Sequence, residues 1–372
     1  MTSFAQEVYL SWLAGAGIPA GHLRDLLAAF PDPAGIHAEF ARGHAETYRA
    51  FLPGKTEDTL RQSAGMEHLE KLAGLLAKNR IQTVVQGEPG YPDVLLTLDD
   101  PPAILFYQGD LSLAGRASAA MIGSRSASWK GVAAAEKTAR ILSENGIVII
   151  SGLAYGIDAA AHRGCLKGKS PTIAVLGCGL DQDYPAENAA LRREILEHGG
   201  LLLSEYAPGD KPLGWHFPVR NRIISGLADC LIVMEARIRS GSMTTVQHAL
   251  AQGRDVFVYP GEPDNPKTEG NHLLLREGAI FFTSAEDIME DMHWLDKKKE
   301  VRHNSDCAVP GVELSPAEKG VMDRLASGEQ SFDQLCAVLN RPAGELMSLL
   351  TVMQIRGLIE AMPGKLYRIR QD

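Results

Sequence analysis

The chain lacks the cysteine patterns that build disulfide frameworks and zinc sites. Its five cysteines are scattered along 372 residues, and no two of them form a C-x-x-C pair. Disulfide scaffolds and cysteine zinc sites both need thiols grouped at short, regular spacings. The sequence therefore argues against both classes, and we expect no metal site and no cofactor.

Long hydrophobic runs and a basic leader are also missing. No run reaches the roughly 18–20 apolar residues that a membrane span requires. The first residues, Met-Thr-Ser-Phe-Ala-Gln-Glu-Val, have neither the basic segment nor the apolar core of a signal peptide. We expect a soluble, cytoplasmic protein with no membrane partner.

An excess of positive charge is absent as well. The formal net charge is −9 at pH 7, so the chain as a whole does not attract nucleic acid or an anionic membrane. Any phosphate binding must come from a local basic patch. The hydrophobic share of 45% supports a buried core, and the length exceeds the roughly 100–200 residues of one domain.

The middle of the chain alternates short apolar segments with helix-like segments. Such alternation is typical of a parallel sheet covered by helices on both faces, with the ligand at the carboxyl ends of the strands. Two further strands are expected at 81–85 and 103–107, on the edge of this sheet. The main strands are expected at 119–122, 147–151, 172–176, 200–204, 229–235, 255–259 and 279–282.

Small helices are expected in residues 1–80, among them 7–14, 22–30 and 66–79. Gly15 and Gly17 stand between the first two, as in a helix-hairpin-helix whose backbone amides grip a DNA phosphate. The alternative is a small helical docking module.

The C-terminal part is divided into a polar linker at 296–311, with a run of three lysines, and a compact tail at 312–372. Helices are expected at 315–326, 331–339 and 342–355, and strands at 358–361 and 366–369, which together suggest a winged helix. The second helix of the helix-turn-helix has only Arg356 as a basic residue. This favours protein docking over reading of duplex DNA.

Gly123-Ser124-Arg125 follows the first main strand and precedes a helix-like segment. A turn of this kind leaves free backbone N–H groups at a helix start, which is a natural anion site. Arg125 adds a charged fork that suits phosphate. The alternative is an ordinary tight turn with a surface arginine.

Residues 214–228 contain Phe217, Arg220, Asn221 and Arg222 ahead of a helix. Arginines among aromatic residues are typical of single-stranded nucleic acid binding, because the cations bind phosphates and the rings stack on bases. The alternative is a buried aromatic cluster whose arginines pair with acids such as Glu205 and Glu235. Both can hold together, one arginine being structural and the other at the ligand.

Three further stretches carry weaker signals. Ser240-Gly241-Ser242 opens a helix and forms a second possible anion nest. Asp158 and His162 lie one helical turn apart, and a structural role is favoured over a catalytic one because no nucleophile accompanies them. Gly177-x-Gly179 follows a strand, but the third glycine of the dinucleotide fingerprint is missing. This argues against NAD or FAD.

Half of the chain strongly resembles the DprA/Smf family of bacterial DNA-processing proteins. The matching signatures are Gly-Ser-Arg at 123–125, Ser-Gly-Leu-Ala-x-Gly-Ile-Asp-Ala-x-Ala-His at 151–162, Tyr-Pro-x-x-Asn at 184–188, Ser-Glu at 204–205, Phe-Pro-x-Arg-Asn-Arg-Ile-Ile at 217–224 and Ser-Gly-Ser at 240–242.

This resemblance implies an α/β fold with an extended Rossmann-like core at 81–295 that binds single-stranded DNA without catalysis. It also implies a SAM-like helical domain at 1–80, a C-terminal winged helix, a homodimer, and loading of the RecA recombinase onto incoming strands during natural transformation. The positions carried over for DNA are Gly123, Ser124, Arg125, Gly152, Phe217, Arg220, Asn221, Arg222, Ser240, Gly241 and Ser242. Lys169 and Lys211 match less well.

An enzymatic alternative comes from a similar fold, that of the LOG-type nucleoside-monophosphate phosphoribohydrolases. Those enzymes place a catalytic Glu in a glycine-rich turn, whereas residues 240–248 of this chain contain no carboxylate. Glycosidic hydrolysis depends on a placed carboxylate. We therefore expect a non-enzymatic protein, with nucleotide processing as the alternative.

Overall fold

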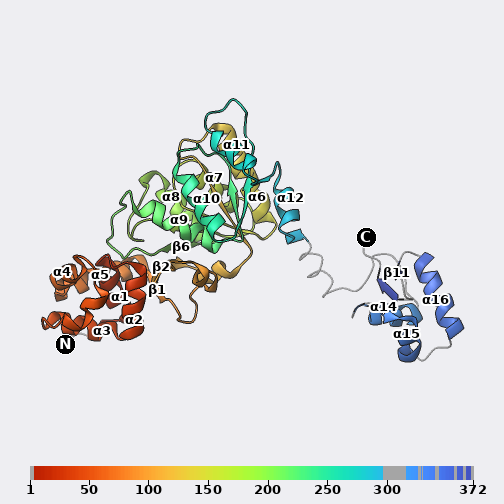
Figure 1. Cartoon of the computed structure of the whole chain (residues 1–372), viewed down its shortest axis with the longest axis horizontal. Helices are drawn as coiled ribbons and strands as arrows, with labels where there is room; N and C mark the ends of the chain where they lie inside the picture. The colour runs from red at the N-terminus through yellow and green to blue at the C-terminus, as the bar shows by residue number, and fades with distance from the viewer. Residues whose placement is uncertain are drawn as a thin grey trace. The chain divides into compact units, whose positions relative to one another are not determined.

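The computed structural model describes residues 4–295 and, in the C-terminal part, residues 316–325, 328, 330–339, 343–355, 358–362 and 366–369. The chain forms two compact units, Met1–Leu295 and Asp296–Asp372 (Figure 1). The expected linker at 296–311 and Arg356 lie outside the described residues.

The first unit is built on a nine-stranded sheet with the order β1-β2-β6-β5-β4-β3-β7-β8-β9. The strands from β6 to β9 are parallel, and β1 and β2 add an antiparallel edge next to β6. The parallel order runs outward from β3 in both directions, so the topological switch point lies between β3 and β7. The strands are β1 (Gln82–Val85), β2 (Ile104–Gly109), β3 (Ser118–Ile122), β4 (Val148–Ser151), β5 (Thr172–Leu176), β6 (Leu201–Ser204), β7 (Cys230–Val233), β8 (Asp255–Val258) and β9 (Ile280–Phe281).

Helices cover both faces of this sheet, because alternate residues of each buried strand point to opposite sides. In β3, Ala119 and Met121 pack with the helices of one face, while Ala120 and Ile122 pack with those of the other. The first face holds α6 (Trp129–Glu144), α7 (Ile157–Leu166), α8 (Ala189–Glu197) and α12 (Ala285–Asp291), and the second holds α9 (His216–Leu227), α10 (Gly241–Ala251) and α11 (Glu269–Arg276). This layered α/β core agrees with the sequence-based prediction.

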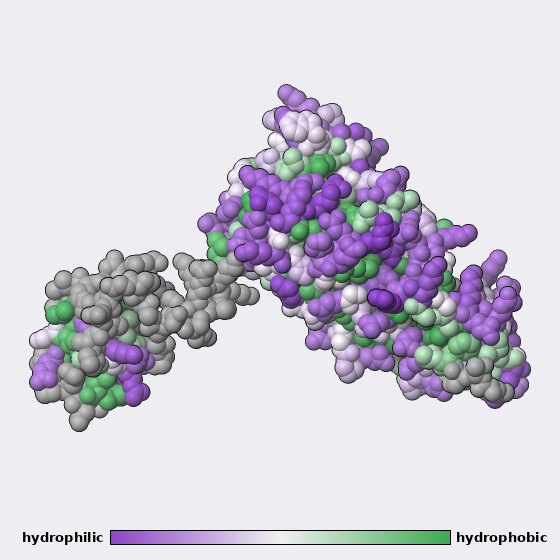
Figure 2. Space-filling view, turned by 180° about the vertical axis from the view of Figure 1, so that it is seen from behind, coloured by the Kyte–Doolittle hydropathy of each residue, from purple (hydrophilic) through white to green (hydrophobic). Residues whose placement is uncertain are grey.

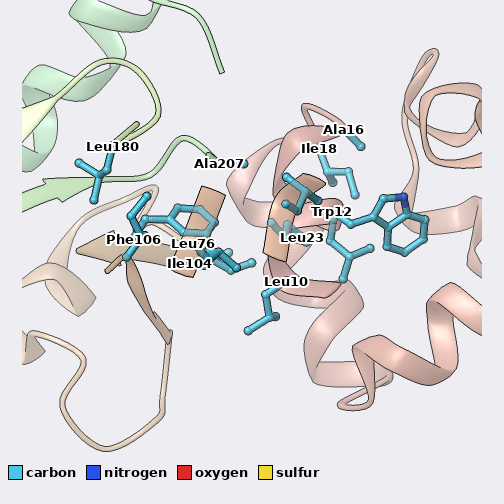
Figure 3. Close-up of a cluster of buried hydrophobic side chains, with 14 of the residues drawn as sticks. Leu10, Trp12, Ala16, Ile18, Leu23, Leu76, Ile104, Phe106, Leu180 and Ala207 are labelled. Atoms are coloured by element: carbon cyan, nitrogen blue, oxygen red, sulfur yellow. The ribbon is translucent and has the colours of Figure 1, made fainter. Parts of the chain in front are cut away.

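The N-terminal helices pack directly on the sheet. They are α1 (Gln6–Gly15), α2 (Ala20–Ala29), α3 (Pro33–Ala41), α4 (Thr56–Ser63) and α5 (Met66–Asn79), with a 3-10 segment at Glu46–Phe51. One hydrophobic cluster runs from Trp12 to Phe106 in β2 (Figure 3). A methyl group added to Gly15 would lie 3.6 Å from Ala207 Cβ, and Ala16 is buried in the cluster. Ala16 therefore packs into the core while Gly15 and Gly17 are exposed, and both interpretations of the hairpin stay predictions.

The described part of the second unit contains three helices and a small sheet. The elements are α14 (Pro316–Leu325), β10 (Gln330–Ser331), α15 (Phe332–Leu339), α16 (Ala343–Ile355), β11 (Ile359–Met362) and β12 (Leu366–Ile369). The strands pair antiparallel in the order β10-β12-β11. Leu335, Leu350 and Tyr367 form part of its own core. The expected winged helix is confirmed, with β10 as an additional strand.

Three observations on the described residues concern membrane spans, the hydropathy of the surface and metal sites. No helix among the described residues combines the length and apolar character needed to cross a bilayer. The face of the molecule in Figure 2 is mainly hydrophilic, with hydrophobic side chains in small scattered groups. Within the described ranges, no cluster of His, Cys, Asp and Glu side chains is suited to hold a metal ion.

Candidate nucleic-acid interface

A pocket lies at the carboxyl ends of β3, β4 and β5. It is lined by Arg125, Gly152, Ala154, Tyr155, Leu176, Gly177, Cys178, Tyr184, Pro185 and Phe217. Open α/β sheets bind ligands outside the carboxyl ends of their strands. The structure thus brings together three of the predicted site positions, Arg125, Gly152 and Phe217, where a ligand is expected.

Two glycines allow the walls of this pocket to approach each other. A Cβ atom on Gly177 would lie 2.9 Å from the Phe217 ring, and one on Gly152 would lie 2.6 Å from the Arg220 guanidinium. Either contact is too short for a side chain. The Phe217 ring therefore lies close against the end of β5, where only glycine leaves room for it.

Arg125 is the free cation of the pocket. Its side chain is exposed, and its guanidinium lies 5.3 Å from the centre of the Phe217 ring. No acidic side chain in the described part of the chain is within ion-pair distance of it. Because a guanidinium can stack on a ring while its N–H groups donate to phosphate, Arg125 is poised for an anion.

Tyr155 and Tyr184 complete the rim, and neither was among the predicted site residues. Their side chains are 39% and 38% exposed, and the Tyr184 ring centre lies 5.5 Å from that of Phe217. Asn188 holds the two loops together, because its Nδ2 donates to Leu153 O at 2.9 Å. The sequence signal for Tyr184 was the Tyr-Pro-x-x-Asn signature at 184–188, and that for Tyr155 was its place four residues after the end of β4.

The backbone of the Gly123-Ser124-Arg125 turn differs from the prediction. Ser124 N donates to Glu235 O at 2.6 Å, and Ser128 N donates to the Glu235 carboxylate at 2.8 Å. Ser128 Oγ donates to the same carboxylate. The N–H groups of Ser124 and Ser128 are therefore already bonded to Glu235 and are not available to an anion. The free group of the turn is the Arg125 side chain.

Arg220 is buried beneath the pocket and is 3% exposed. Its Nη1 donates to Gly152 O at 3.0 Å and also to Val175 O. It therefore fixes the ends of β4 and β5. Burial lowers the pKa of Arg220, and the nearby Asp158 carboxylate opposes this. Of the two roles considered for the arginines of residues 214–228, at the ligand or in the fold, the geometry gives Arg220 the role in the fold.

Asp158 and His162 also belong to the buried interior. Asp158 Oδ2 accepts a hydrogen bond from Gly152 N at 3.2 Å, whereas His162 Nδ1 lies 2.8 Å from Thr172 Oγ1. Burial, with a contribution from Arg220, lowers the pKa of His162 to about 3. A neutral, buried ring cannot exchange protons with a substrate near pH 7, so the favoured structural interpretation fits this pair.

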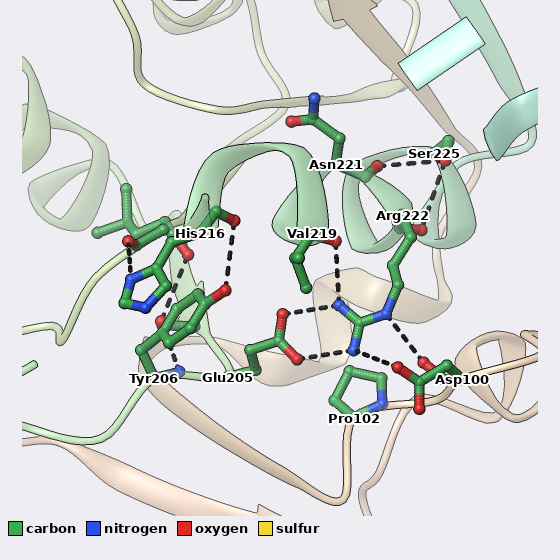
Figure 4. A network of polar contacts seen from close by, with 12 residues as sticks. Asp100, Pro102, Glu205, Tyr206, His216, Val219, Asn221, Arg222 and Ser225 are labelled. Carbon is green, nitrogen blue, oxygen red and sulfur yellow. Dashed lines mark hydrogen bonds and ion pairs between the residues drawn. The ribbon is translucent and has the colours of Figure 1, made fainter. Parts of the chain in front are cut away.

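Arg222 has its charge paired inside the protein (Figure 4). Its Nη1 and Nη2 donate to the two carboxylate oxygens of Glu205 at 2.6 and 2.7 Å, and its Nε donates to Asp100 O at 2.9 Å. The residue is 7% exposed. The predicted DNA-binding position at Arg222 is thus placed in a buried, two-pronged ion pair that ties α9 to β6.

Asn221 connects the pocket to the start of α10. Its Nδ2 donates to Gly241 O at 3.4 Å, and Ser240 Oγ donates to Arg237 O at 2.8 Å. Asn221 lies one helical turn after Phe217, about 6 Å along the axis of α9. The predicted residues Ser240, Gly241 and Ser242 therefore lie beside α9, at the same edge of the sheet as the pocket.

The two predicted lysines lie at different edges of the sheet. Lys211 is exposed in the loop between β6 and α9, at the carboxyl edge. Lys169 is exposed between α7 and β5, at the amino end of β5. Because all carboxyl ends of the parallel strands meet at the other edge, the structure does not bring Lys169 to the site.

Family models match two parts of the chain. Residues 82–293 match DNA recombination-mediator protein A, and residues 308–365 match the DprA winged helix domain. The chain is 38% identical over 289 residues to Protein Smf of Escherichia coli (strain K12), covering 76% of this chain and 75% of that protein. It is 45% identical over 204 residues to DNA processing protein DprA of Streptococcus pneumoniae, which covers 55% of this chain and 72% of that protein.

Solved structures agree with these matches. The crystal structure of DprA from Streptococcus pneumoniae is similar with a TM-score of 0.60 and 34% identity, covering 78% of this chain and 98% of that one. DNA processing protein A from Helicobacter pylori, described for its single-stranded DNA binding mode, is similar with a TM-score of 0.52 and 31% identity, covering 57% and 95%. By sequence and by fold, the chain belongs to the DNA recombination-mediator protein A family, also called DprA or Smf.

Proposed function

We propose that this protein binds single-stranded DNA at the pocket formed by Arg125, Gly152, Gly177 and Phe217. The observation that carries the proposal is the unpaired, exposed Arg125 guanidinium stacked on the Phe217 ring. In this proposal Arg125 binds one backbone phosphate, and the exposed rings of Tyr155 and Tyr184 stack on bases. Because every base has a ring face, such a surface binds strands with little regard to sequence.

The family supplies the wider role in this proposal. We propose that the protein processes incoming DNA in natural transformation, protecting single strands and loading a RecA-type recombinase onto them in the cytoplasm. We also propose that it works as a homodimer. Support comes from the family match over residues 82–293. Sedimentation of the purified chain tests the dimer, and co-purification with RecA in the presence and absence of a single strand tests the recombinase contact.

Binding is tested with labelled single-stranded and double-stranded oligonucleotides of one sequence. We expect mobility shifts with the single strand, and an affinity that falls as salt rises with a slope of about −0.7 per phosphate contact. Equal binding of the duplex contradicts the preference for single strands, and an affinity for the single strand that salt does not change contradicts the phosphate contact.

Nucleotide processing has less support than strand binding, because no residue of Gly241–Ala251 carries the carboxylate that glycosidic hydrolysis requires. For the winged helix, we propose a protein-docking role. Its α16 helix, Ala343–Ile355, contains no Lys or Arg, whereas helices that read the major groove contact bases and phosphates with such side chains.

A further inference from the structure

Trp129 is unusually exposed for a tryptophan. It is the first residue of α6, four residues after Arg125, and its side chain is 75% exposed. Two of the other three tryptophans, Trp12 and Trp294, are buried. Tryptophan is highly buried on average because its large ring is costly to hydrate. The Lys130 ammonium lies over the Trp129 ring, 5.8 Å from its centre, and the rest of the ring is exposed at the carboxyl edge of the sheet.

Two free arginines lie across the switch point from this ring. Arg237 and Arg239 are exposed in the segment between β7 and α10. Their guanidinium groups have no ion-pair or hydrogen-bond partner among the described residues. They differ in this from Lys130, whose ammonium is paired with Glu262.

Glu235 joins the start of α6, which carries the ring, to the segment that carries the arginines. Ser128, which precedes Trp129, donates its N–H and its hydroxyl to the Glu235 carboxylate. Glu235 precedes Arg237 by two residues and is 3% exposed. The acid between the two sides is thus buried and hydrogen-bonded, while the aromatic ring and both cations face solvent.

We infer that Trp129, Arg237 and Arg239 form a second contact for a single DNA strand, here called the switch-point surface. The inference rests on the proposed function and extends it beyond the Arg125 pocket. Trp129 stacks on a base, and the two arginines bind phosphates of the same strand. Positive charge beside an exposed ring is the chemistry that single strands require, and it is continuous with the Arg125 turn through residues 126–128.

The test compares a short and a long oligothymidylate, of about six and about twenty nucleotides, since one site of this kind covers about 4–16 nucleotides. For the long strand, we expect Trp129→Ala to weaken binding about 5- to 100-fold with the salt slope unchanged. Trp129→Phe keeps a ring and should retain most of the affinity. Arg237→Ala with Arg239→Ala should reduce the salt slope by about 1.4, or 0.7 for each lost phosphate contact.

Two controls keep the test specific to this surface. Lys137→Ala with Arg276→Ala removes the same charge from exposed positions elsewhere and should leave affinity and slope near those of the parent chain. In a Trp215→Phe chain, Trp129 is the remaining strongly exposed tryptophan, and the long strand should quench its fluorescence. Unfolding midpoints of all variants should match that of the parent.

The outcomes separate this inference from the proposed function. Suppose that Arg125→Ala weakens binding, while Trp129→Ala and the Arg237→Ala, Arg239→Ala chain bind the long strand as the parent does. The inference about the switch-point surface is then wrong, and the proposed function of the pocket is still supported. If the parent chain binds neither strand, both proposals fall.

Discussion

The Gly123–Arg125 turn and the first turns of α9 both contain arginine, but the arginine of the turn is exposed and those of α9 are buried. Arg125 is exposed and lies beside the Phe217 ring, and no acid in the part of the chain that the structure describes is within ion-pair distance of it. Arg220 and Arg222, on α9, are 3% and 7% exposed, and their guanidinium groups are bonded to protein oxygens. All three lie at one edge of one sheet.

The difference shows that an arginine beside aromatic residues can serve a ligand or the fold, and that its partner decides which. The partner of Arg222 is Glu205, and a two-pronged bond of this kind satisfies both charges. Arg125 lacks such a partner among the described residues. The buried arginines hold the strand ends and α9 in place, and the exposed one is the arginine that we propose binds phosphate.

The largest effect is expected from Arg222→Ala. Removing one member of a buried ion pair leaves Glu205 without its counter-charge, which costs about 3–5 kcal/mol of unfolding free energy. Urea unfolding measures this loss. The exposed Arg193→Ala serves as the control and should change stability by less than about 0.5 kcal/mol. If Arg222→Ala loses little unfolding free energy but much DNA affinity, Arg222 serves the ligand and not the fold.

Arg125→Ala should behave in the opposite way. A charged hydrogen bond to phosphate is worth about 1.5–3 kcal/mol, so affinity for a single strand should fall by about one to two orders of magnitude, while the unfolding midpoint stays the same. Fluorescence anisotropy at several salt concentrations measures the loss. Arg125→Lys keeps the positive charge but loses the planar guanidinium, so its affinity should lie between that of the parent chain and that of Arg125→Ala. An unchanged salt slope in Arg125→Ala would falsify the phosphate contact.

A pH-dependent effect is expected from Asp210, in the loop that leads to α9. Burial and the Asp181 carboxylate raise the pKa of Asp210 to about 7, against the stabilising N–H of Ala207. An unfolded Asp titrates near about 3.9, so the folded protein binds the extra proton between these values. Stability should therefore decrease as pH rises from about 4 to 7, by at most about 1.4 kcal/mol per pH unit.

Asp210→Asn should remove this part of the pH profile, which thermal unfolding between pH 4 and 8 can follow. Asp264→Asn is the control, because Asp264 is exposed. If the Asp210→Asn profile matches that of the parent, Asp210 is ionised over the whole range and the expectation fails.

The smallest effect is expected from deleting residues 296–372. These residues form a compact unit of their own, and none of the proposed contacts with the strand lies in it. Affinity for a single strand should change by less than about twofold, or about 0.4 kcal/mol. A large loss would assign part of the strand contact to the winged helix, and a loss of duplex binding alone would make it a duplex reader.

The sheet was predictable because its strands are short, apolar and buried on both faces. β5 was found at its observed bounds, and so was α5. The helices α3 and α4 were missed, although Asp32 caps α3 and Pro33 stands at its first position, which are ordinary start signals. Their apolar spacing is weak, so local signals without a clear hydrophobic pattern were not enough.

The candidate site was predictable as a set of strand ends but not as a set of free side chains. Arg222 and Glu205 are 17 residues apart, and Ser128 and Glu235 are 107 apart. Such pairings depend on how the sheet brings distant loops together. Sequence can therefore show which edge holds the polar residues, whereas only the fold shows which charges remain unpaired.

Glu235 has a consequence for how this edge can hold a strand. A Cβ atom on residue 131 would lie 2.5 Å from the Glu235 carboxyl carbon, so the carboxylate fits over the start of α6 only because Gly131 has no side chain. A helix start fixes a phosphate at one point with rigid backbone groups, and here Glu235 takes the N–H of the residue that begins the helix. The arginines proposed to bind phosphate have long, flexible side chains, which can release one phosphate and take the next. A strand bound as we propose would therefore be able to slide along the protein.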